Sequence, residues 1–558
     1  MTQQCTVKPS GETTGNTGRP PRRTGKGPVI PAAGTSSSDV PVLIAGGGPT
    51  GLALAIGLGQ LGVQCEVVDT RPAPTRVPRA ARCGARAMEI FRRLGISGQL
   101  RAAGLPGEAP LDVVICAGSL ARPLTRHRYP SVADALATTL EVNDGTMPLE
   151  PHVILSQYTL EPLLREVAEA TPGVTVRFGA ELLDFASTGG GVTAMVHTAT
   201  RLRAIRADHL IGCDGAASTV RRVLGVELRG ERREPLRQAL IYCPDLYERL
   251  PGGPAARAIQ YHVTGGHPCT LIVQDDTQHF ALQAATGGPP LATMFEAVAG
   301  AVCQPLSYKV VHEDEWPQQL LLADRYTDDR TRVLLAGDAA HPASTTGGLG
   351  LSTAIGDTAD LAWKLAATQH GWGGPALLAS YEAERRPVAA QAITASFVSA
   401  VAEEPWSVDL RDVELGYRYT GSPVISHAGG TQPTGYAPTT WPGARLPHLW
   451  LDDGNPLHDV LGNCFTLLRV PGAGASGATA DRVDGEFARE LAAEFGRFGA
   501  PLDLVEVTSA AAQAVYAGHR LILVRPDLHV AWRSGDSQPP PATLARLVTG
   551  NLVTGNTA

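Results

Sequence analysis

Three glycines and one carboxylate form the first group of residues whose types and spacing suggest chemistry. The stretch 46–51 fits the pattern G-x-G-x-x-G, and Asp69 follows at about the distance expected of a dinucleotide fingerprint. In such a loop Gly46 allows a sharp turn, Gly48 lets the backbone approach a pyrophosphate, and Gly51 allows a helix to pack closely on a strand. Asp69 would accept hydrogen bonds from a ribose hydroxyl. The group predicts a dinucleotide site but does not by itself distinguish FAD from NAD.

Two further carboxylates, far apart in the chain, stand in similar surroundings. Asp214 lies in the stretch I-G-C-D-G-A-A-S at 211–218, and Asp338 lies in L-A-G-D-A-A-H-P at 335–342. Each follows an apolar run typical of a buried strand and precedes small residues that could open a helix. Because an aspartate at such a position can simply cap the helix, either motif alone leaves a structural and a ligand-binding interpretation equally open.

The elements that would position the first group form a βαβ unit. Residues 40–45 predict a buried strand, 52–61 a helix and 65–69 a second strand. Free N–H groups at the start of that helix would hold phosphates. The sequence contains no second G-x-G-x-x-G after a strand, no G-x-S-x-G elbow, no H-E-x-x-H and no Walker A loop. A second dinucleotide would therefore bind without a Rossmann domain of its own.

Length and composition narrow the class of protein. A chain of 558 residues exceeds what one core supports, so we expect two or three domains. The net charge of −7 gives no basic footprint for nucleic acid. Nine cysteines without a C-x-x-C pair argue against a disulfide scaffold or a zinc site and indicate a cytoplasmic protein. The uncharged stretch 40–63 is interrupted by glycines and proline, and no secretory signal is recognised, so no membrane association is expected.

Taken in order, the glycine loop, the C-D-G stretch and the A-G-D-A-A-H stretch resemble the flavoprotein aromatic hydroxylases typified by para-hydroxybenzoate hydroxylase. The similarity covers roughly residues 40–400 and continues in G-G-L-G-L-S-T at 347–353 and Y-E-A-E-R-R-P at 381–387. It implies an α/β fold, with a Rossmann-like FAD-binding domain and an inserted antiparallel-sheet substrate domain. It also implies non-covalent FAD, NADPH or NADH as co-substrate, and O2, which together form a flavin C4a-hydroperoxide that hydroxylates a small aromatic molecule.

The resemblance assigns cofactor roles to particular positions. Gly46, Gly48 and Gly51, with Pro49 and Thr50 between them, match the pyrophosphate turn, and Asp69 matches the acid that binds ribose. Arg79 matches an arginine along the FAD phosphates, and Gln157 matches a glutamine near the ribityl chain. Asp214 matches an aspartate that serves both FAD and NAD(P)H, and Asp338, after Gly337, matches the carboxylate that holds the ribityl hydroxyls. A helix beginning near Gly348, Gly350 and Leu351 would point its N–H groups at the flavin pyrimidine edge.

The chain departs from the family at the pocket over the flavin. Ser344 and Thr345 stand where the family usually has two prolines, and Ser352 stands where it often has asparagine. Smaller, hydroxylated side chains leave more room, so we expect a bulky phenolic or quinone-like polycyclic substrate of the aromatic polyketide kind. A simple phenol is the alternative, and a Baeyer–Villiger or rearrangement reaction on the same fold stays open. A flavin-binding protein without turnover is a third possibility.

Several polar residues near these motifs have a structural interpretation. His341 sits beside Asp338 and is expected to cap or pack the turn, and Arg385 and Arg386 are expected to pair with Glu382 or Asp360. No catalytic side chain is assigned, because the flavin carries the chemistry.

Residues 227–321 alternate apolar and polar positions and predict antiparallel strands near 239–242, 258–261, 270–273 and 280–283, joined by residues 111–150. This sheet would cover the flavin and wall the substrate pocket. Tyr242, Tyr261, His262 and Gln274 could face the pocket, but the alternation cannot choose the face, and each is expected to be structural.

The chain after residue 416 resembles the thioredoxin-like C-terminal domain of the phenol-hydroxylase branch, including the ending R-P-D-L-H-V-A-W-R at 525–533. It has no C-x-x-C, and Cys464 stands alone, so packing or oligomerisation is expected in place of redox chemistry. The protein would be a monomer or homodimer. The predicted domains are a disordered extension (1–38), an FAD-binding domain (39–110, 151–226 and 322–402), a substrate-binding domain (111–150 and 227–321), a linker (403–422) and the thioredoxin-like domain (423–558).

Overall fold

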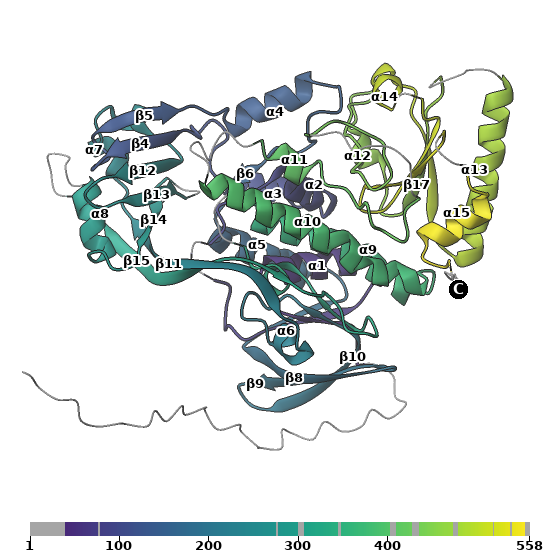
Figure 1. Cartoon of the computed structure of the whole chain (residues 1–558), viewed down its shortest axis with the longest axis horizontal. Coiled ribbons are helices and arrows are strands. Elements are labelled where there is room, and N and C mark those ends of the chain that lie inside the picture. The colour runs from purple at the N-terminus through teal and green to yellow at the C-terminus, as the bar shows by residue number, and fades with distance from the viewer. Residues whose placement is uncertain are drawn as a thin grey trace, which may run out of the picture.

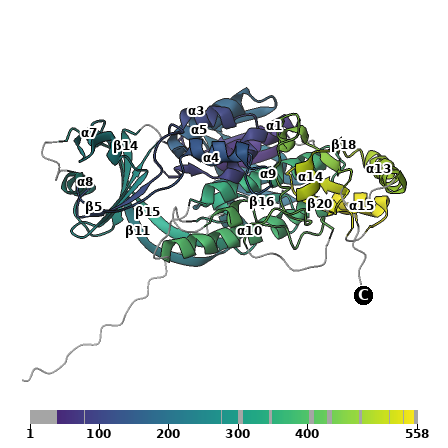
Figure 2. The ribbon, with the colours of Figure 1, turned by 90° about the horizontal axis from the view of Figure 1, so that it is seen from above.

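The computed structural model describes residues 39–75, 77, 79–274, 277–299, 306–343, 348–401, 409–426, 435–472, 478–516, 518–535 and 538–552. The predicted N-terminal extension and the predictions made from Ser344 and Thr345 lie outside these residues. The described part has three regions in a row, with the sheet of β11–β15 at one end, a central α/β region, and the C-terminal region at the other end (Figures 1 and 2). The predicted α/β fold class is confirmed. No helix within the described ranges combines the length and apolarity needed to cross a bilayer.

The central region is built on a mixed sheet. Among the described residues it has the order β7-β2-β1-β10-β9-β8, with β16 beside β10. Its strands are β1 (Val40–Ala45), β2 (Cys65–Asp69), β7 (Val174–Phe178), β8 (Ala180–Thr188), β9 (Gly191–Thr198), β10 (Leu202–Gly212) and β16 (Val333–Leu335). Strands β7, β2, β1, β10 and β16 run parallel, and β8 and β9 extend the sheet antiparallel. The carboxyl ends of the parallel strands therefore meet at one edge, which is where ligands bind in such sheets.

Helices cover the central sheet and present their first turns to that edge. Helix α1 (Pro49–Gln60) follows β1 directly and begins three residues earlier than predicted, because Pro49 suits the first helical position. It packs against α5 (Gln157–Ala170) and α9 (Gly350–Gln369) through apolar side chains. The other helices and short strands here are β3 (Arg82–Cys83), α2 (Ala85–Arg93), α3 (Ser97–Ala103), β6 (Val153–Ile154), α6 (Thr219–Leu224), η2 (Gly337–Ala339), α10 (Pro375–Val401) and α11 (Arg411–Glu414).

The second sheet has the order β15-β11-β14-β13-β12-β4-β5 among the described residues. Its strands are β4 (Val113–Ala117), β5 (Pro123–His127), β11 (Leu228–Tyr242), β12 (Gln260–Thr264), β13 (Cys269–Val273), β14 (His279–Ala285) and β15 (Lys309–Ala323). All pairs are antiparallel except β12 and β4, so the purely antiparallel expectation needs that correction. One face packs against α7 (Leu246–Arg249), η1 (Gly253–Ala256) and α8 (Leu291–Ala299). Helix α4 (Val132–Glu141) follows β5.

The C-terminal region contains a sheet of order β18-β17-β19-β20, and helices precede, separate and follow its strands in the sequence. Strands β17 (Phe465–Arg469) and β18 (Leu502–Glu506) are parallel and joined through α13 (Ala478–Phe498), and β19 (Leu521–Val524) with β20 (Val530–Arg533) forms an antiparallel hairpin. Helices α12 (Leu457–Val460), α14 (Ala510–Val515) and α15 (Pro541–Val548) complete it. This connectivity is the predicted thioredoxin-like arrangement.

Candidate functional site

A cavity of about 1080 Å³ lies between the carboxyl edge of the central sheet and the second sheet. Every residue predicted to bind cofactor lines it, except Gly51 and Gly337. The cavity is therefore bounded at one end by the dinucleotide motifs and at the other by sheet side chains. The predicted residues that line it are Gly46, Gly48, Pro49, Thr50, Asp69, Arg79, Gln157, Asp214, Asp338, Gly348, Gly350 and Leu351.

The glycine loop has two positions where a side chain is excluded and one where space is open. Gly46 has φ +108°, and a Cβ there would lie 2.2 Å from the carbonyl oxygen of Cys213. A Cβ on Gly51 would lie 1.9 Å from the carbonyl oxygen of Gly46. A Cβ on Gly48 would meet nothing closer than Glu161 Oε1 at 3.9 Å. Gly48 caps α1 and lines the cavity, so a ligand can approach the backbone N–H groups of the first turn.

The Asp69 carboxylate is held by protein groups at the end of β2. Its Oδ2 accepts a hydrogen bond of 2.7 Å from the backbone N–H of Gly47, and Arg71 donates to both oxygens. The Arg71 guanidinium also donates to Glu161, 3.0 Å away on α5. A ribose hydroxyl at Asp69 would therefore share the carboxylate with Arg71, a residue for which the sequence motif gave no signal.

Gln157 joins the same set of polar groups from the first turn of α5. Its Nε2 donates to Glu161 Oε1 at 2.7 Å, and its Oε1 accepts from the backbone N–H of Ala80 at 3.4 Å. Gln157 thus ties α5 to the segment that carries Arg79. Arg79 stacks over Trp316 of β15, with its guanidinium carbon 5.9 Å from the ring centroid.

Asp214 has the structural role that the sequence left open, and its ligand-binding role stays a prediction. Its Oδ2 accepts hydrogen bonds from the backbone N–H groups of Thr219 and Val220, so the side chain caps α6. Its Oδ1 is buried and has no hydrogen-bond partner among the described residues. Burial raises the pKa of Asp214, although hydrogen bonds from Ser218 and the backbone oppose the rise. A buried acceptor without a partner at a cavity wall is a place for a ligand donor.

Asp338 lies on a tight turn that is held in place by the buried carboxylate of Asp357. Gly337 has φ +60°, and its N–H donates to Asp357 Oδ2 at 3.0 Å. The same oxygen is 2.6 Å from His341 Nε2, and Arg385 Nε donates to Asp357 Oδ1 at 2.8 Å. Burial acts to raise the pKa of Asp357, but His341 and Arg385 outweigh it and hold that pKa below its usual value. His341 therefore supports the turn.

The carboxylate of Asp338 itself is exposed to the cavity. No hydrogen-bond donor from the described residues reaches it. Its position deep in the molecule raises its pKa, while His341 and Arg79 act in the opposite direction. Asp338 thus offers two acceptor oxygens to whatever occupies the cavity.

The expected pairing of the two arginines on α10 needs correction. Arg385 pairs with Asp357, and Arg386 donates to the backbone oxygen of Ala323. Glu382 instead accepts from the backbone N–H of Tyr326. Of the two expected partners, Glu382 lies on the same helix as the arginines, and Asp360 on α9 pairs instead with Lys364 and Arg525.

The first turn of α9 forms the remaining wall at the cofactor end. Gly348 has φ +65° and lies beside Arg82, whose guanidinium pairs with Glu414 of α11 at 2.5 Å. Ser352 lies one turn along and accepts from the backbone N–H of Gly84 at 3.1 Å. Arg82 lines the cavity and was not identified from the sequence.

The second sheet contributes one face to the cavity, and the register decides which face. Of the four residues considered from the sequence, only His262 lines the cavity. Tyr261 points into the opposite core, where its hydroxyl donates to Ala256 O at 2.7 Å. The lining residues of its strands that the sequence did not identify are Val113, Leu236, Gln260, Thr270, Ile272, Val273, Gln283, Trp316, Pro317 and Gln319.

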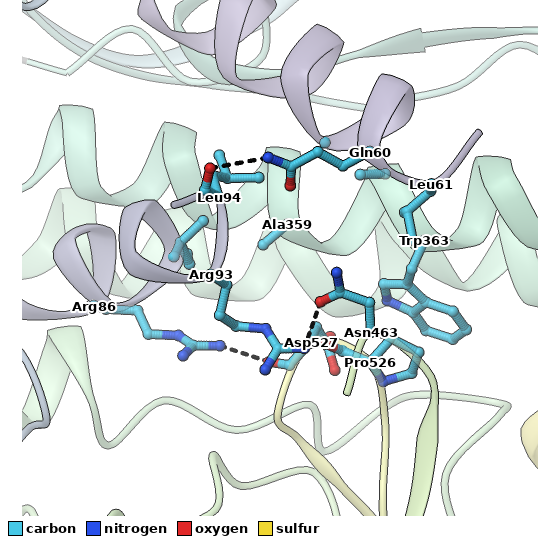
Figure 3. Close-up of a pocket in the computed structure, with 13 residues that line it drawn as sticks. Gln60, Leu61, Arg86, Arg93, Leu94, Ala359, Trp363, Asn463, Pro526 and Asp527 are labelled. Atoms are coloured by element: carbon cyan, nitrogen blue, oxygen red, sulfur yellow. Dashed lines mark hydrogen bonds between the residues drawn. The ribbon is translucent and has the colours of Figure 1, made fainter. Parts of the chain in front are cut away.

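A second, much smaller cavity of about 70 Å³ lies where α1, α2 and α9 meet the C-terminal region (Figure 3). Figure 3 shows Arg93 donating to Asn463 and Arg86 donating to the backbone of Asp527 across this joint. Trp363 Nε1 and Arg86 Nε are buried here without a hydrogen-bond partner among the described residues. The volume suits a few ordered waters and is too small for an aromatic substrate.

Comparison with known proteins agrees with this geometry. Residues 39–243 and 299–396 match the family model described as FAD binding domain, and residues 439–552 match that described as aromatic-ring hydroxylase, C-terminal. Tetracenomycin B2 monooxygenase-dioxygenase of Streptomyces olivaceus is 32% identical, with 90% of this chain and 96% of the relative covered.

Two solved structures are similar over nearly their whole length. The native and K252c-bound RebC-10x structure has a TM-score of 0.80 at 30% identity, covering 92% of this chain and 99% of that one. A ternary complex of aklavinone-11 hydroxylase with FAD and aklavinone has a TM-score of 0.79 at 27% identity, covering 92% and 100%. The chain therefore belongs to the flavoprotein monooxygenases in which an FAD-binding domain is joined to an aromatic-ring hydroxylase C-terminal domain.

Proposed function

We propose that this monooxygenase uses NADPH or NADH and O2 to hydroxylate a polycyclic phenolic substrate of the aromatic polyketide kind. The observation that carries the proposal is one cavity of about 1080 Å³ that is continuous from the glycine loop to the second sheet. It exceeds the ~300–1,000 Å³ of a typical small-molecule pocket, as a site for a dinucleotide and an aromatic substrate together must.

The residues at the cofactor end fit FAD. The open space at Gly48 admits a pyrophosphate to the start of α1, where free N–H groups favour anions. The exposed carboxylate of Asp338 suits ribityl hydroxyls, and the unpartnered Oδ1 of Asp214 suits a further donor. The first turn of α9 at Gly350 and Leu351 would direct N–H groups to the flavin ring.

When bound, FAD would supply the redox chemistry, in which NAD(P)H provides a hydride, one oxygen atom of O2 enters the substrate and the other leaves as water. The chain supplies binding, orientation and exclusion of water. Trp316 and Ile272 offer apolar area to a planar ring system, and Gln260 and Gln283 offer hydrogen bonds to its oxygens. The described lining residues from the second sheet carry no formal charge at neutral pH, which suits a neutral phenol or quinone.

The substrate class rests on the size and polarity of this wall together with the relatives. The structure of aklavinone-11 hydroxylase contains bound aklavinone, and the relative from Streptomyces olivaceus is named for tetracenomycin B2. A monocyclic phenol would leave much of the same wall without contact.

The proposal is tested by purifying the protein, identifying its flavin and following NAD(P)H oxidation and O2 uptake with panels of monocyclic and tetracyclic phenols. We expect FAD released by acid, slow reduction without substrate, and faster reduction with coupled O2 uptake for tetracyclic phenols. The product should gain one oxygen as a ring hydroxyl, whereas an oxygen inserted next to a ketone would indicate Baeyer–Villiger chemistry. Tight coupling with monocyclic phenols and none with tetracyclic ones would contradict the substrate class.

A further inference from the structure

A row of polar side chains crosses the second sheet on the face that borders the cavity. Residues 262 of β12, 270 of β13, 283 of β14 and 238 of β11 are consecutive cross-strand partners. Directly paired residues share one face of a sheet, so His262, Thr270, Gln283 and Gln238 point the same way. The first three line the cavity, and Gln238 is buried beside them. We call these four residues the polar row.

His262 offers a hydrogen-bond acceptor at one end of the polar row. Burial lowers its pKa, so the imidazole is neutral at physiological pH and has one acceptor nitrogen. Its Nδ1 lies 3.3 Å from Thr270 Oγ1. When Nδ1–H donates to that hydroxyl, Nε2 is the acceptor. Because the Thr270 hydroxyl can accept from Nδ1–H, it supports the tautomer in which Nε2 accepts from a ligand hydroxyl.

Gln283 offers a second acceptor in the same row. Its Nε2 donates to Gln238 Oε1 at 2.6 Å, and Gln238 is 1% exposed. This bond fixes which way the Gln283 amide is turned, because the donor end is engaged by the neighbouring strand. The carbonyl end, Oε1, is then the acceptor available to a ligand.

The two acceptors are two strands apart, which corresponds to about 10 Å between their backbones. Thr270 lies between them, and Ile272 and Leu236 border the row with apolar surface. Adjacent hydroxyls on one ring lie too close together to reach both acceptors easily. Hydroxyls on different rings of a flat, fused ligand match the spacing better.

We propose that the polar row is the specificity-determining surface of this site and selects fused aromatic ligands that carry hydroxyl groups on two different rings. His262 and Gln283 accept one hydroxyl each, while Thr270 and Gln238 orient them. The inference rests on the proposed function, because it takes the second sheet as the wall that contacts substrate.

The test compares three probe ligands on the FAD-loaded protein by calorimetry. They are 2,6-dihydroxyanthraquinone, 2-hydroxyanthraquinone and 2,6-dimethoxyanthraquinone, which have two, one and no hydroxyl donors on the same ring system. Since one hydrogen bond is worth roughly a factor of ten in affinity, we expect Kd to rise about tenfold with each donor removed.

Variants then assign that preference to the polar row. His262→Phe and Gln283→Met should each reduce the advantage of the second hydroxyl to within about twofold. Thr270→Val should reduce it in part, and Thr270→Ser should restore it, which a purely structural role for Thr270 would not predict. Ile272→Val, on the same strand and face, is the matched control and should leave the preference unchanged. The Thr270 pair keeps the test decisive if either larger substitution prevents folding.

The outcomes separate this inference from the proposed function. Protein that purifies without FAD, or never couples NAD(P)H oxidation to phenols, would overturn both. Protein that hydroxylates phenols but binds the three probes equally, or keeps its preference in all polar-row variants, would overturn this inference alone. A graded preference that disappears in His262→Phe, weakens in Thr270→Val and is present again in Thr270→Ser supports it.

Discussion

Arg525 is the residue whose removal should most directly reveal how the C-terminal region is attached. Its guanidinium is fully buried and donates to Asp360 of α9, Glu384 of α10 and Asp527, at distances from 2.6 to 3.1 Å. Lys364 is the other cation of this cluster, 2.8 Å from Asp360 and 2.6 Å from Glu384. Two cations therefore compensate three carboxylates where the domains meet.

The substitution Arg525→Met keeps the apolar stem and removes the charge. It leaves three buried carboxylates against one cation, and breaking a buried ion pair in this way typically costs about 3–5 kcal/mol of folding free energy. For a cooperative unit of a few hundred residues, this corresponds to a thermal midpoint lower by about 10 °C. The exposed Arg497, which pairs with Glu494 on α13, is the control, and Arg497→Met should change stability by less than about 1 kcal/mol.

The effect of Arg525→Met should also depend on pH. Burial acts to raise the pKa of Glu384, but Arg525 and Lys364 outweigh it and hold that pKa below its usual value. In the wild type this carboxylate contributes stability above its unfolded pKa, which is lost only as pH falls through the lower folded pKa. Without Arg525 its folded pKa rises, so the deficit of the variant should shrink as pH is lowered from 8 to 5.

The assay is differential scanning fluorimetry of wild type, Arg525→Met, Arg525→Lys and Arg497→Met at several pH values. Arg525→Lys should fall between wild type and Arg525→Met, because it keeps the charge and loses the forked geometry. A midpoint for Arg525→Met no lower than that of Arg497→Met, or a deficit that grows at lower pH, would refute the reasoning.

Three further predictions concern the cofactor site and the lone thiol. Asp338→Ala should fold normally but bind FAD at least about tenfold more weakly in a flavin titration, and unchanged affinity would place the ribityl chain elsewhere. Gly48→Ala should match the wild type in thermal stability of the FAD-free protein yet lose FAD affinity. Gly51→Ala should instead give less folded protein, because its Cβ meets a backbone oxygen. Equal behaviour of the two variants would contradict the loop geometry. Cys464→Ser should keep full turnover, since burial and the neighbouring Asp503 raise the pKa of the thiol to about 12 and leave it protonated, and loss of activity would indicate a redox role.

Much of the cofactor end was predictable because its signals are local. Gly46 and Gly337 have positive φ, and a Cβ on Gly51 would meet the carbonyl oxygen of Gly46 earlier in the same loop. Each motif also follows directly on a buried parallel strand. Since parallel strands carry such loops at the same edge, Asp214 and Asp338 could be expected near the glycine loop. The roles assigned to these residues toward FAD stay predictions until the cofactor is measured.

The substrate wall was not predictable to the same extent. Alternation in β12 showed that Tyr261 and His262 point to opposite faces, but not which face borders the cavity. Gln283 and Trp316 line the cavity because β14 and β15 both pair with β11. The helix α8 separates these two strands in the chain, so the sequence did not predict that their side chains would meet at one cavity.

By itself the sequence determined the dinucleotide loop, the order of the motifs, the α/β class and the absence of a C-x-x-C pair in the C-terminal region, because each depends on neighbouring residues or on composition. Only the tertiary structure decided that Arg71 shares Asp69, that Arg385 pairs with Asp357, that Arg525 joins two regions, and that the polar row faces the cavity. Apart from Arg71, these arrangements are contacts between segments far apart in the chain. Their partners are selected by strand register and by the need to neutralise buried charge, and neither is encoded in local spacing.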